Sequence, residues 1–306
     1  MGVGERSCGR GSVVMRKKEN LMFQDDHDRG LVWDLGVMLE RRRALGLLAG
    51  VAGGAVLAAC RQGGPGGPPP MSDPESNVTG TAPDGETCIK LPQETNGPYP
   101  ADGTNTKSGQ TVNVLTQSGI QRSDIRASFG GVSGTAAGVP LELTITLVNV
   151  GGQCKPLAGY AIYVWHCDAA GKYSLYDLTD QNFLRGVQVT NTKGEVRFVT
   201  IVPGTYMGRY PHIHFEIFAS AGKAASGKDS LLISQFAVPA EALKPIYAAD
   251  KNYASSVKPL VANAGIANDN VFGDNTPEQI KAQTLALSGD ATTGYKGSVT
   301  VGIKPA

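Results

Sequence analysis

Three things are scarce in this sequence of 306 residues: an excess of charge of one sign, histidine and cysteine. The 28 Lys and Arg are balanced by 27 Asp and Glu, and a net charge of +1 excludes a strongly basic nucleic-acid binder and a long acidic tail. Charged residues make up only 18%, beside 40 Gly and 18 Pro, which excludes a coiled coil or a helical bundle. Four His and five Cys leave few residues for soft-metal chemistry, so each can be considered individually.

An apolar run near the N-terminus divides the chain. Residues 44–59 read ALGLLAGVAGGAVLAA, a run with the length of a signal-peptide core that is short for a membrane span. Three arginines at 41–43 precede it, as in a positive n-region, and residues 57–60 read LAAC. This ending resembles a bacterial lipobox, in which Cys60 is acylated and anchors the mature protein to the membrane. The alternative is an ordinary apolar segment that ends in Cys.

We therefore expect an exported protein, lipid-anchored to the cell envelope in the periplasm or on the outer face. The consecutive arginines also resemble a twin-arginine export signal. Residues 1–59 are interpreted as an N-terminal extension plus signal peptide, with Met38 as a hypothetical true start because it stands just before the arginines. Residues 60–87 are rich in Pro and Gly and are predicted to be a tether without a core.

Residues 88–306 are predicted to form one β-sandwich domain with long loops and few short helices. Apolar and polar residues alternate in 141–148, LELTITLV, with the period of two that is typical of strands. Further strand-like runs lie at 160–167, 196–202, 212–219, 231–238 and 298–303. Helical patterns are confined to 239–247 and 277–286. Strands that are joined by turns, and that do not alternate regularly with helices, favour a sandwich.

Export to an oxidising compartment favours a disulfide. With Cys60 assigned to lipid, the expected mature chain holds Cys88, Cys154 and Cys167, so one thiol is left over. We expect Cys88 to pair with Cys154, because both lie in loops that flank strands. Cys167 lies inside a strand and is predicted to be a buried free thiol.

The run PHIHF contains the best candidates for metal binding. His212 and His214 are two residues apart on a predicted strand, so both side chains point to one face, whereas Ile213 and Phe215 point into the core. Two imidazoles on one face can bind a single metal ion, and two hydrogen-bonded structural histidines are the alternative. Asp or Glu could complete a site for ferrous iron, whereas phenolate oxygen suits ferric iron. His166 neighbours Trp165 and is interpreted as a structural histidine.

The sequence resembles the intradiol ring-cleavage dioxygenases, the catechol and protocatechuate dioxygenase-like family, over roughly residues 88–240. The resemblance rests on a series of motifs in the family's order. They are NGPYP (96–100), RSDI (122–125), VWHCDAAGKYSLYD (164–177), FLRG (183–186), IVPG (201–204) and GTYMGRYPHIHFEIF (204–218). The family fold is a β-sandwich, in agreement with the periodicity.

The resemblance implies a non-haem Fe(3+) ion held by two tyrosines and two histidines. The histidines correspond to His212 and His214, and one tyrosine corresponds to Tyr206. The other corresponds to Tyr173, with Tyr176 as a rival three residues later. A bound ferric ion would stabilise the phenolates, although a free phenol ionises only near pH 10.

The reaction that the resemblance implies cleaves a catechol-type ring between its two hydroxylated carbons with O2, giving a muconate-type diacid. Tyr206 is expected to act also as a base that takes up a substrate proton. Arg209 matches a family arginine placed over the substrate ring, where a cation stabilises developing negative charge. Gln235 matches a glutamine that hydrogen-bonds oxygen intermediates. Trp165 and Asp168 are interpreted as structural, the latter as a turn cap.

Two other functions remain open at this stage. The first is a non-catalytic envelope module of the same ancestry that binds or carries a ligand. The second is a copper or zinc protein that uses His212 and His214. The expected partners of the enzyme are a catechol-type small molecule and O2, with membrane attachment through Cys60 and no nucleic acid. The sequence leaves assembly into a homo-oligomer open.

Overall fold

The computed structural model describes Met1 and residues 79–305. The predicted signal segment, Cys60 and the tether up to residue 78 lie outside the described residues. The strands are β1(Thr79–Thr81), β2(Thr87–Ile89), β3(Asp102–Lys107), β4(Gln110–Asn113), β5(Pro140–Asn149), β6(Lys155–Pro156), β7(Ala161–Trp165), β8(Arg185–Val189), β9(Glu195–Ile201), β10(His212–Phe218), β11(Leu232–Ala237), β12(Ala286–Asp290) and β13(Gly294–Ile303). The α-helices are α2(Ala240–Ala249), α3(Ala254–Asn263) and α4(Pro277–Gln283).

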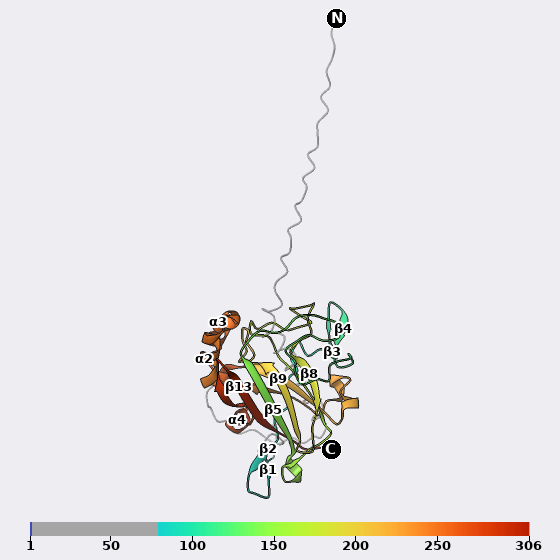
Figure 1. Ribbon diagram of the computed structural model, residues 1–306, viewed down its shortest axis with the longest axis vertical. Coiled ribbons are helices and arrows are strands. Elements are labelled where there is room, and N and C mark those ends of the chain that lie inside the picture. Colours follow the sequence, from blue (N-terminus) through green and yellow to red (C-terminus); the bar gives the residue numbers. More distant parts are fainter. Residues whose placement is uncertain (2–78, 306) are drawn as a thin grey trace, which may run out of the picture.

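Two larger sheets form the β-sandwich that the sequence predicted. One has the strand order β11-β10-β7-β8, and the other has the order β12-β13-β5-β6 with β9 also paired to β5. Strands β5 and β13 run parallel, side by side across the molecule (Figure 1), whereas the other neighbours in these two sheets are antiparallel. The three helices gather along one flank of the sandwich. Among the described residues, no helix is both long and apolar enough to cross a membrane.

The core lies between the two larger sheets. Leu143 and Ile145 of β5 are in one apolar cluster with Phe215 and Ile217 of β10 and Phe236 of β11, and all are almost fully buried or fully buried. The Phe215 and Phe236 rings stack with centroids 4.2 Å apart. The alternation that predicted the strands therefore also selects the side chains that fill the core.

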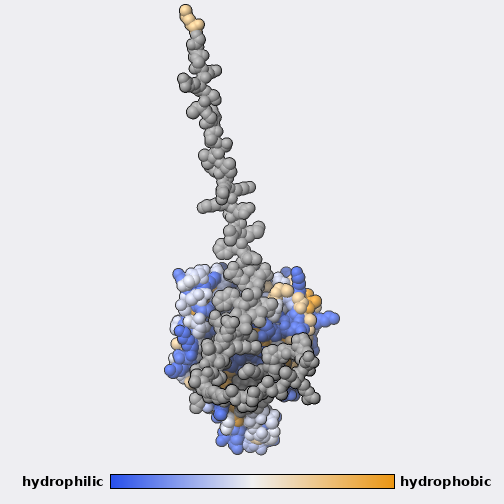
Figure 2. Space-filling model, turned by 180° about the vertical axis from the view of Figure 1, so that it is seen from behind, coloured by the Kyte–Doolittle hydropathy of each residue, from blue (hydrophilic) through white to orange (hydrophobic). Residues whose placement is uncertain are grey.

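A disulfide joins Cys88 to Cys154, as predicted, and closes the end of β5 against the hairpin of β1 and β2. Cys167 is a buried free thiol, also as predicted, but it follows β7 and does not lie inside a strand. Strand β1 lies within residues 60–87, the stretch that was predicted to be a tether. On the face shown in Figure 2, hydrophilic side chains predominate outside the grey atoms and apolar ones form small separate spots.

Candidate metal centre

The predicted site residues His212, His214 and Gln235 lie on the outer face of the four-stranded sheet. His214 of β10 is in register with Gln235 of β11 on one side and with Trp165 of β7 on the other. Trp165 is in register with Arg185 of β8. Residues directly opposite one another on neighbouring strands point to the same face. One cross-strand row therefore carries Gln235, His214, Trp165 and Arg185, and His212 lies two residues further along the same face.

The two predicted histidines face each other. The Nε2 atoms of His212 and His214 are 3.0 Å apart, and both side chains are 1–2% exposed. The Nδ1 atom of His212 lies 2.5 Å from the carbonyl oxygen of Tyr210. A carbonyl can only accept a hydrogen bond, so Nδ1 carries the proton and Nε2 presents a lone pair. The indole of Trp165 stacks on His214 at 4.8 Å and 7°, which confirms its structural role and fixes the imidazole plane.

Two tyrosines complete the cluster. The Tyr173 hydroxyl lies 3.4 Å from Nε2 of His212, and the ring of Tyr206 lies 5.9 Å from the rings of both Tyr173 and His212. Tyr176 instead donates a hydrogen bond to Asn105 and accepts one from the backbone of Ala101. The structure therefore brings Tyr173, and not its rival Tyr176, to the histidines.

The turn before Tyr173 depends on one aspartate and one glycine. Asp168 accepts hydrogen bonds from the backbone N–H groups of Ala170 and Lys172, as expected for a turn cap. Gly171 has φ +82°, and a Cβ atom there would lie 2.4 Å from the carbonyl oxygen of Thr205. Only glycine allows this close approach. The contact places the Tyr173 turn directly against the loop that carries Tyr206.

Burial controls the protonation of this cluster. Desolvation, followed by the charge of Arg209, lowers the pKa of His212 to about 3. Desolvation also lowers the pKa of His214 well below its ordinary value and raises the pKa of Tyr173 well above its own. Without a bound cation, both imidazoles are therefore neutral and Tyr173 is a neutral phenol near pH 7. Neutral imidazoles have the lone pairs that metal binding requires.

Arg209 lies beside this cluster and is almost completely buried. Its Nη1 atom is 3.3 Å from Nε2 of His212, and its Nη2 donates to Oε1 of Gln235 at 2.6 Å. Its Nε donates to Oδ2 of Asp269 at 3.0 Å, forming a buried ion pair. Asp269 was not predicted from the sequence, because it follows Arg209 by 60 residues in a region without a recognisable motif.

Gln235 is held at both ends of its amide. Its Oε1 accepts from Arg209, and its Nε2 donates to the carbonyl oxygen of Thr95 at 3.0 Å.

His166 lies on the opposite face, with Nδ1 2.8 Å from the carbonyl oxygen of Cys167 and Nε2 2.7 Å from Oγ1 of Thr200. Both ring nitrogens of His166 therefore have partners, which confirms that it is a structural histidine.

The two histidine nitrogens lie close enough together to bind one metal ion. Two nitrogen atoms that bind one ion at about 2.0–2.1 Å each can be no more than about 4.2 Å apart, and the two Nε2 atoms are well within that limit. The described residues contain no group of three or more His, Cys, Asp or Glu that could hold a metal. A metal centre here would therefore need the tyrosine oxygens, a hard and anionic donor type that suits ferric iron.

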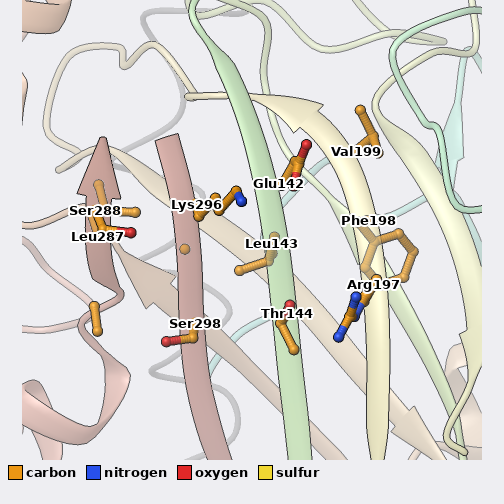
Figure 3. A pocket seen from close by; sticks show the side chains of 12 residues that line it. Glu142, Leu143, Thr144, Arg197, Phe198, Val199, Leu287, Ser288, Lys296 and Ser298 are labelled. Atoms are coloured by element: carbon orange, nitrogen blue, oxygen red, sulfur yellow. The ribbon is translucent and has the colours of Figure 1, made fainter. Parts of the chain in front are cut away.

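A separate groove lies on the outer face of the other sheet (Figure 3). It has a volume of about 560 Å³ and crosses β12, β13, β5 and β9. Charged and hydroxyl side chains line it, among them Glu142, Thr144, Arg197, Lys296 and Ser298. None of the predicted site residues lines this groove, so its position does not coincide with the histidine and tyrosine cluster.

Known proteins resemble this chain in sequence and in fold. The family model described as dioxygenase matches residues 116–284, more than half of the chain and all of the cluster. The protocatechuate 3,4-dioxygenase beta chain of Burkholderia cepacia is 35% identical over 99 residues, which cover 28% of this chain and 41% of that relative. The match thus spans less than half the length of that relative.

Two solved structures share the fold. The intradiol ring-cleavage dioxygenase from Tetranychus urticae superposes with a TM-score of 0.52 at 25% identity, covering 71% of this chain and 96% of that one. The crystal structure of another dioxygenase gives a TM-score of 0.51 at 26% identity, with the same coverage.

Proposed function

The chain belongs to the dioxygenase family, and we propose that it cleaves a catechol-type aromatic ring between its two hydroxylated carbons. Both atoms of O2 enter the product, a muconate-type diacid, while the bond between those carbons breaks. The observation that carries the proposal is that the side chains of His212, His214, Tyr173 and Tyr206 pack together in one buried cluster within the family match.

In this proposal the four side chains hold a ferric ion as two imidazoles and two phenolates. Such an ion would act as a Lewis acid toward the catechol oxygens and would lower the electron density of the ring. The role of the protein is to place these donors in a site with little water. The side chains of Tyr173, His212 and His214 are all 1–2% exposed, and such burial strengthens each electrostatic interaction.

Three side chains have proposed roles in the reaction. The Tyr206 oxygen takes up one proton from the catechol, acting as a general base. The Arg209 guanidinium beside His212 stabilises negative charge that develops on the substrate. Gln235 has both ends of its amide engaged, so we assign it first to holding Arg209 and Thr95 in place.

Iron loading and oxygen uptake test this function. Protein loaded with iron should be red-brown from tyrosinate-to-iron charge transfer and should consume O2 with a catechol, a hydroxyquinol or protocatechuate. The variant His212→Ala should lose iron, and Tyr206→Phe should slow turnover roughly 10²- to 10⁴-fold. Tyr176→Phe is the matched control, because this tyrosine belongs to the same segment but faces Asn105, and it should keep its colour.

The alternatives give different results. Protein that stays colourless after iron loading would favour a zinc or copper site or a binding module. Coloured protein that consumes no O2 with any of the three substrates would contradict the enzymatic proposal and leave a ligand carrier of the same ancestry.

Export and lipid anchoring form a separate proposal that rests on residues 41–60, outside the described part of the chain. The Cys88–Cys154 disulfide supports it, because such bonds persist mainly in oxidising compartments. Labelling of cells with radioactive palmitate should mark the protein, and Cys60→Ala should abolish the label. A label that survives this substitution would contradict the lipobox.

A further inference from the structure

The segment between β11 and β12 braces the loop that carries Tyr206 and Arg209. Tyr253 donates to the carbonyl oxygen of Val202 at 2.6 Å. Ser256 of α3 accepts from the backbone N–H of Thr205 at 2.9 Å. Asp269 accepts from the backbone N–H of Tyr210 at 2.6 Å. All three side chains are 0–1% exposed. The brace thus holds the loop on both sides of the two proposed site residues.

Asp269 does more than hold the backbone, because it also contacts the Arg209 side chain. Its Oδ2 accepts from Nε at 3.0 Å, and its Oδ1 lies 3.5 Å from Nη2. A carboxylate that meets the Nε–Nη2 edge of a guanidinium in this side-on manner fixes the plane of the group as well as its position. Gln235 accepts from Nη2 from another direction. The third nitrogen, Nη1, is thereby turned toward Nε2 of His212.

The carboxylate itself is firmly anchored. Its Oδ1 accepts from the backbone N–H groups of Val271 and Phe272 at 2.8 and 3.1 Å. Burial alone would raise the pKa of Asp269, but the charge of the Arg209 guanidinium holds it below the ordinary value. Asp269 is therefore a rigid anion, whereas an arginine side chain without such a partner has several rotatable bonds to explore.

We propose that Asp269 is the positioning residue for Arg209, fixing the direction in which its Nη1 edge faces His212 and the substrate. The proposal rests on the proposed function for its catalytic consequence, but its geometric part stands independently. A residue that acted only on stability would hold the loop without determining where Nη1 points.

Asp269→Asn tests the proposal. Asparagine has the same shape as aspartate, but its NH2 group replaces one carboxylate oxygen. Each oxygen of Asp269 accepts hydrogen bonds from two or more N–H groups, which the NH2 group cannot do. In a crystal structure of the variant, Nη1 should have left Nε2 of His212. The kcat should fall about 10²-fold, since displacements near 1 Å have such effects, while bound iron and the colour stay unchanged. Asp290→Asn is the matched control. Asp290 also accepts hydrogen bonds from two backbone N–H groups, those of Thr292 and Thr293, but it is exposed on the β12–β13 hairpin. The kcat of this variant should equal that of wild type.

A double-mutant cycle separates positioning from other roles. In an Arg209→Ala background, Asp269→Asn should lower kcat by less than about twofold, because its target is gone. An equal loss in both backgrounds would overturn the proposal, as would an unmoved guanidinium in the crystal. If Asp269→Asn does not fold, Asp269→Glu keeps the charge, shifts the carboxylate by one methylene and should show the same two changes to a smaller degree. If wild type turns over no catechol, the proposed function fails, while the crystal comparison still decides whether Asp269 directs Arg209.

Discussion

The outer faces of the two larger sheets differ in their exposure to solvent. Along β5 and β13, buried residues alternate with exposed or half-exposed ones over much of their length, so the five-stranded sheet has one face in the core and one near solvent. Along β7, β10 and β11 every residue is buried. The four-stranded sheet is therefore covered on both faces, and its outer face carries His212, His214 and Gln235.

The difference shows how a sandwich builds a reactive site. Polar groups on a covered face lose water and must find partners within the protein. Arg185 meets this need by donating to the carbonyl oxygens of Tyr99 and Pro100, and Arg209 by pairing with Asp269. The segments that cover the face thus supply hydrogen-bond partners for it. The open sheet, by contrast, leaves its outer polar groups to water.

The largest expected effect comes from removing a proposed metal donor on the covered face. His214→Ala should reduce bound iron to background and abolish O2 uptake, because one of the two imidazole donors is gone. Thr300→Ala on the exposed face of β13 is the matched change and should leave both quantities at the wild-type level. Metal analysis and an oxygen electrode measure the outcome. Iron retained at full stoichiometry in His214→Ala would contradict the assignment.

The disulfide lies beside the open sheet and should separate stability from activity. Cys88 and Cys154 are 66 residues apart, and loss of a bridge closing such a loop costs about 4 kcal/mol in unfolding free energy. The double variant Cys88→Ser/Cys154→Ser should show this loss in urea unfolding. Its kcat per folded molecule should be unchanged, because the bridge packs with Val148 and Val150 in an apolar cluster that contains none of the proposed site residues. A fall in kcat at full folding would show that the two sheets are coupled.

A lysine placed on the outer face of each sheet tests directly whether that face is shielded from water. Gln235→Lys buries a cation beside Arg209 without a partner and should cost at least about 3 kcal/mol. Thr300→Lys places the same charge on the exposed face and should change the unfolding free energy by less than about 0.5 kcal/mol. Equal costs in urea unfolding would mean that the two faces are equally hydrated.

Glu94, in the segment that covers the sheet, should give a pH-dependent effect. Its Oε1 accepts from Asn275 and Gln283, and desolvation raises its pKa from 4.5 to about 7. A folded-state pKa raised above that of the unfolded chain means that the folded protein holds the proton longer. This contribution is complete below about pH 4.5 and is lost as the pH rises to about 7.

The measurement is urea unfolding of wild type and Glu94→Gln across this range. The wild type should lose roughly 3 kcal/mol relative to the variant between pH 4.5 and 7.5, because glutamine cannot ionise. Parallel stability curves for the two proteins would show that Glu94 has an ordinary pKa.

Most of the sandwich could be predicted from local patterns. The six predicted strand runs correspond to β5, β7, β9, β10, β11 and β13, and the two predicted helical stretches correspond to α2 and α4. Helix α3 was missed because its sequence, ASSVKPLVAN, contains two serines and an internal proline that disfavour a helix. It forms because Ser256 and Pro259 are buried against the rest of the molecule, and such tertiary contacts outweigh propensity.

The site could be predicted only in part. His212, His214, Tyr206 and Arg209 were found from one continuous segment, and the structure brings them together. Tyr173 was preferred to Tyr176 because of its position after Gly171 and Lys172, and in the structure its hydroxyl turns toward His212, whereas that of Tyr176 turns toward Asn105. Glu94 and Asp269 carry no local pattern that reveals burial.

The sequence by itself determined that two imidazoles share one face of a strand, because side chains alternate with a period of two whatever surrounds the strand. It also determined the apolar face that forms the core. Only the tertiary structure decided that the histidine face is covered and that Asp269 directs Arg209. Burial and pairing of this kind depend on residues 39 and 60 positions away in the chain, whose approach follows from the packing of the whole chain.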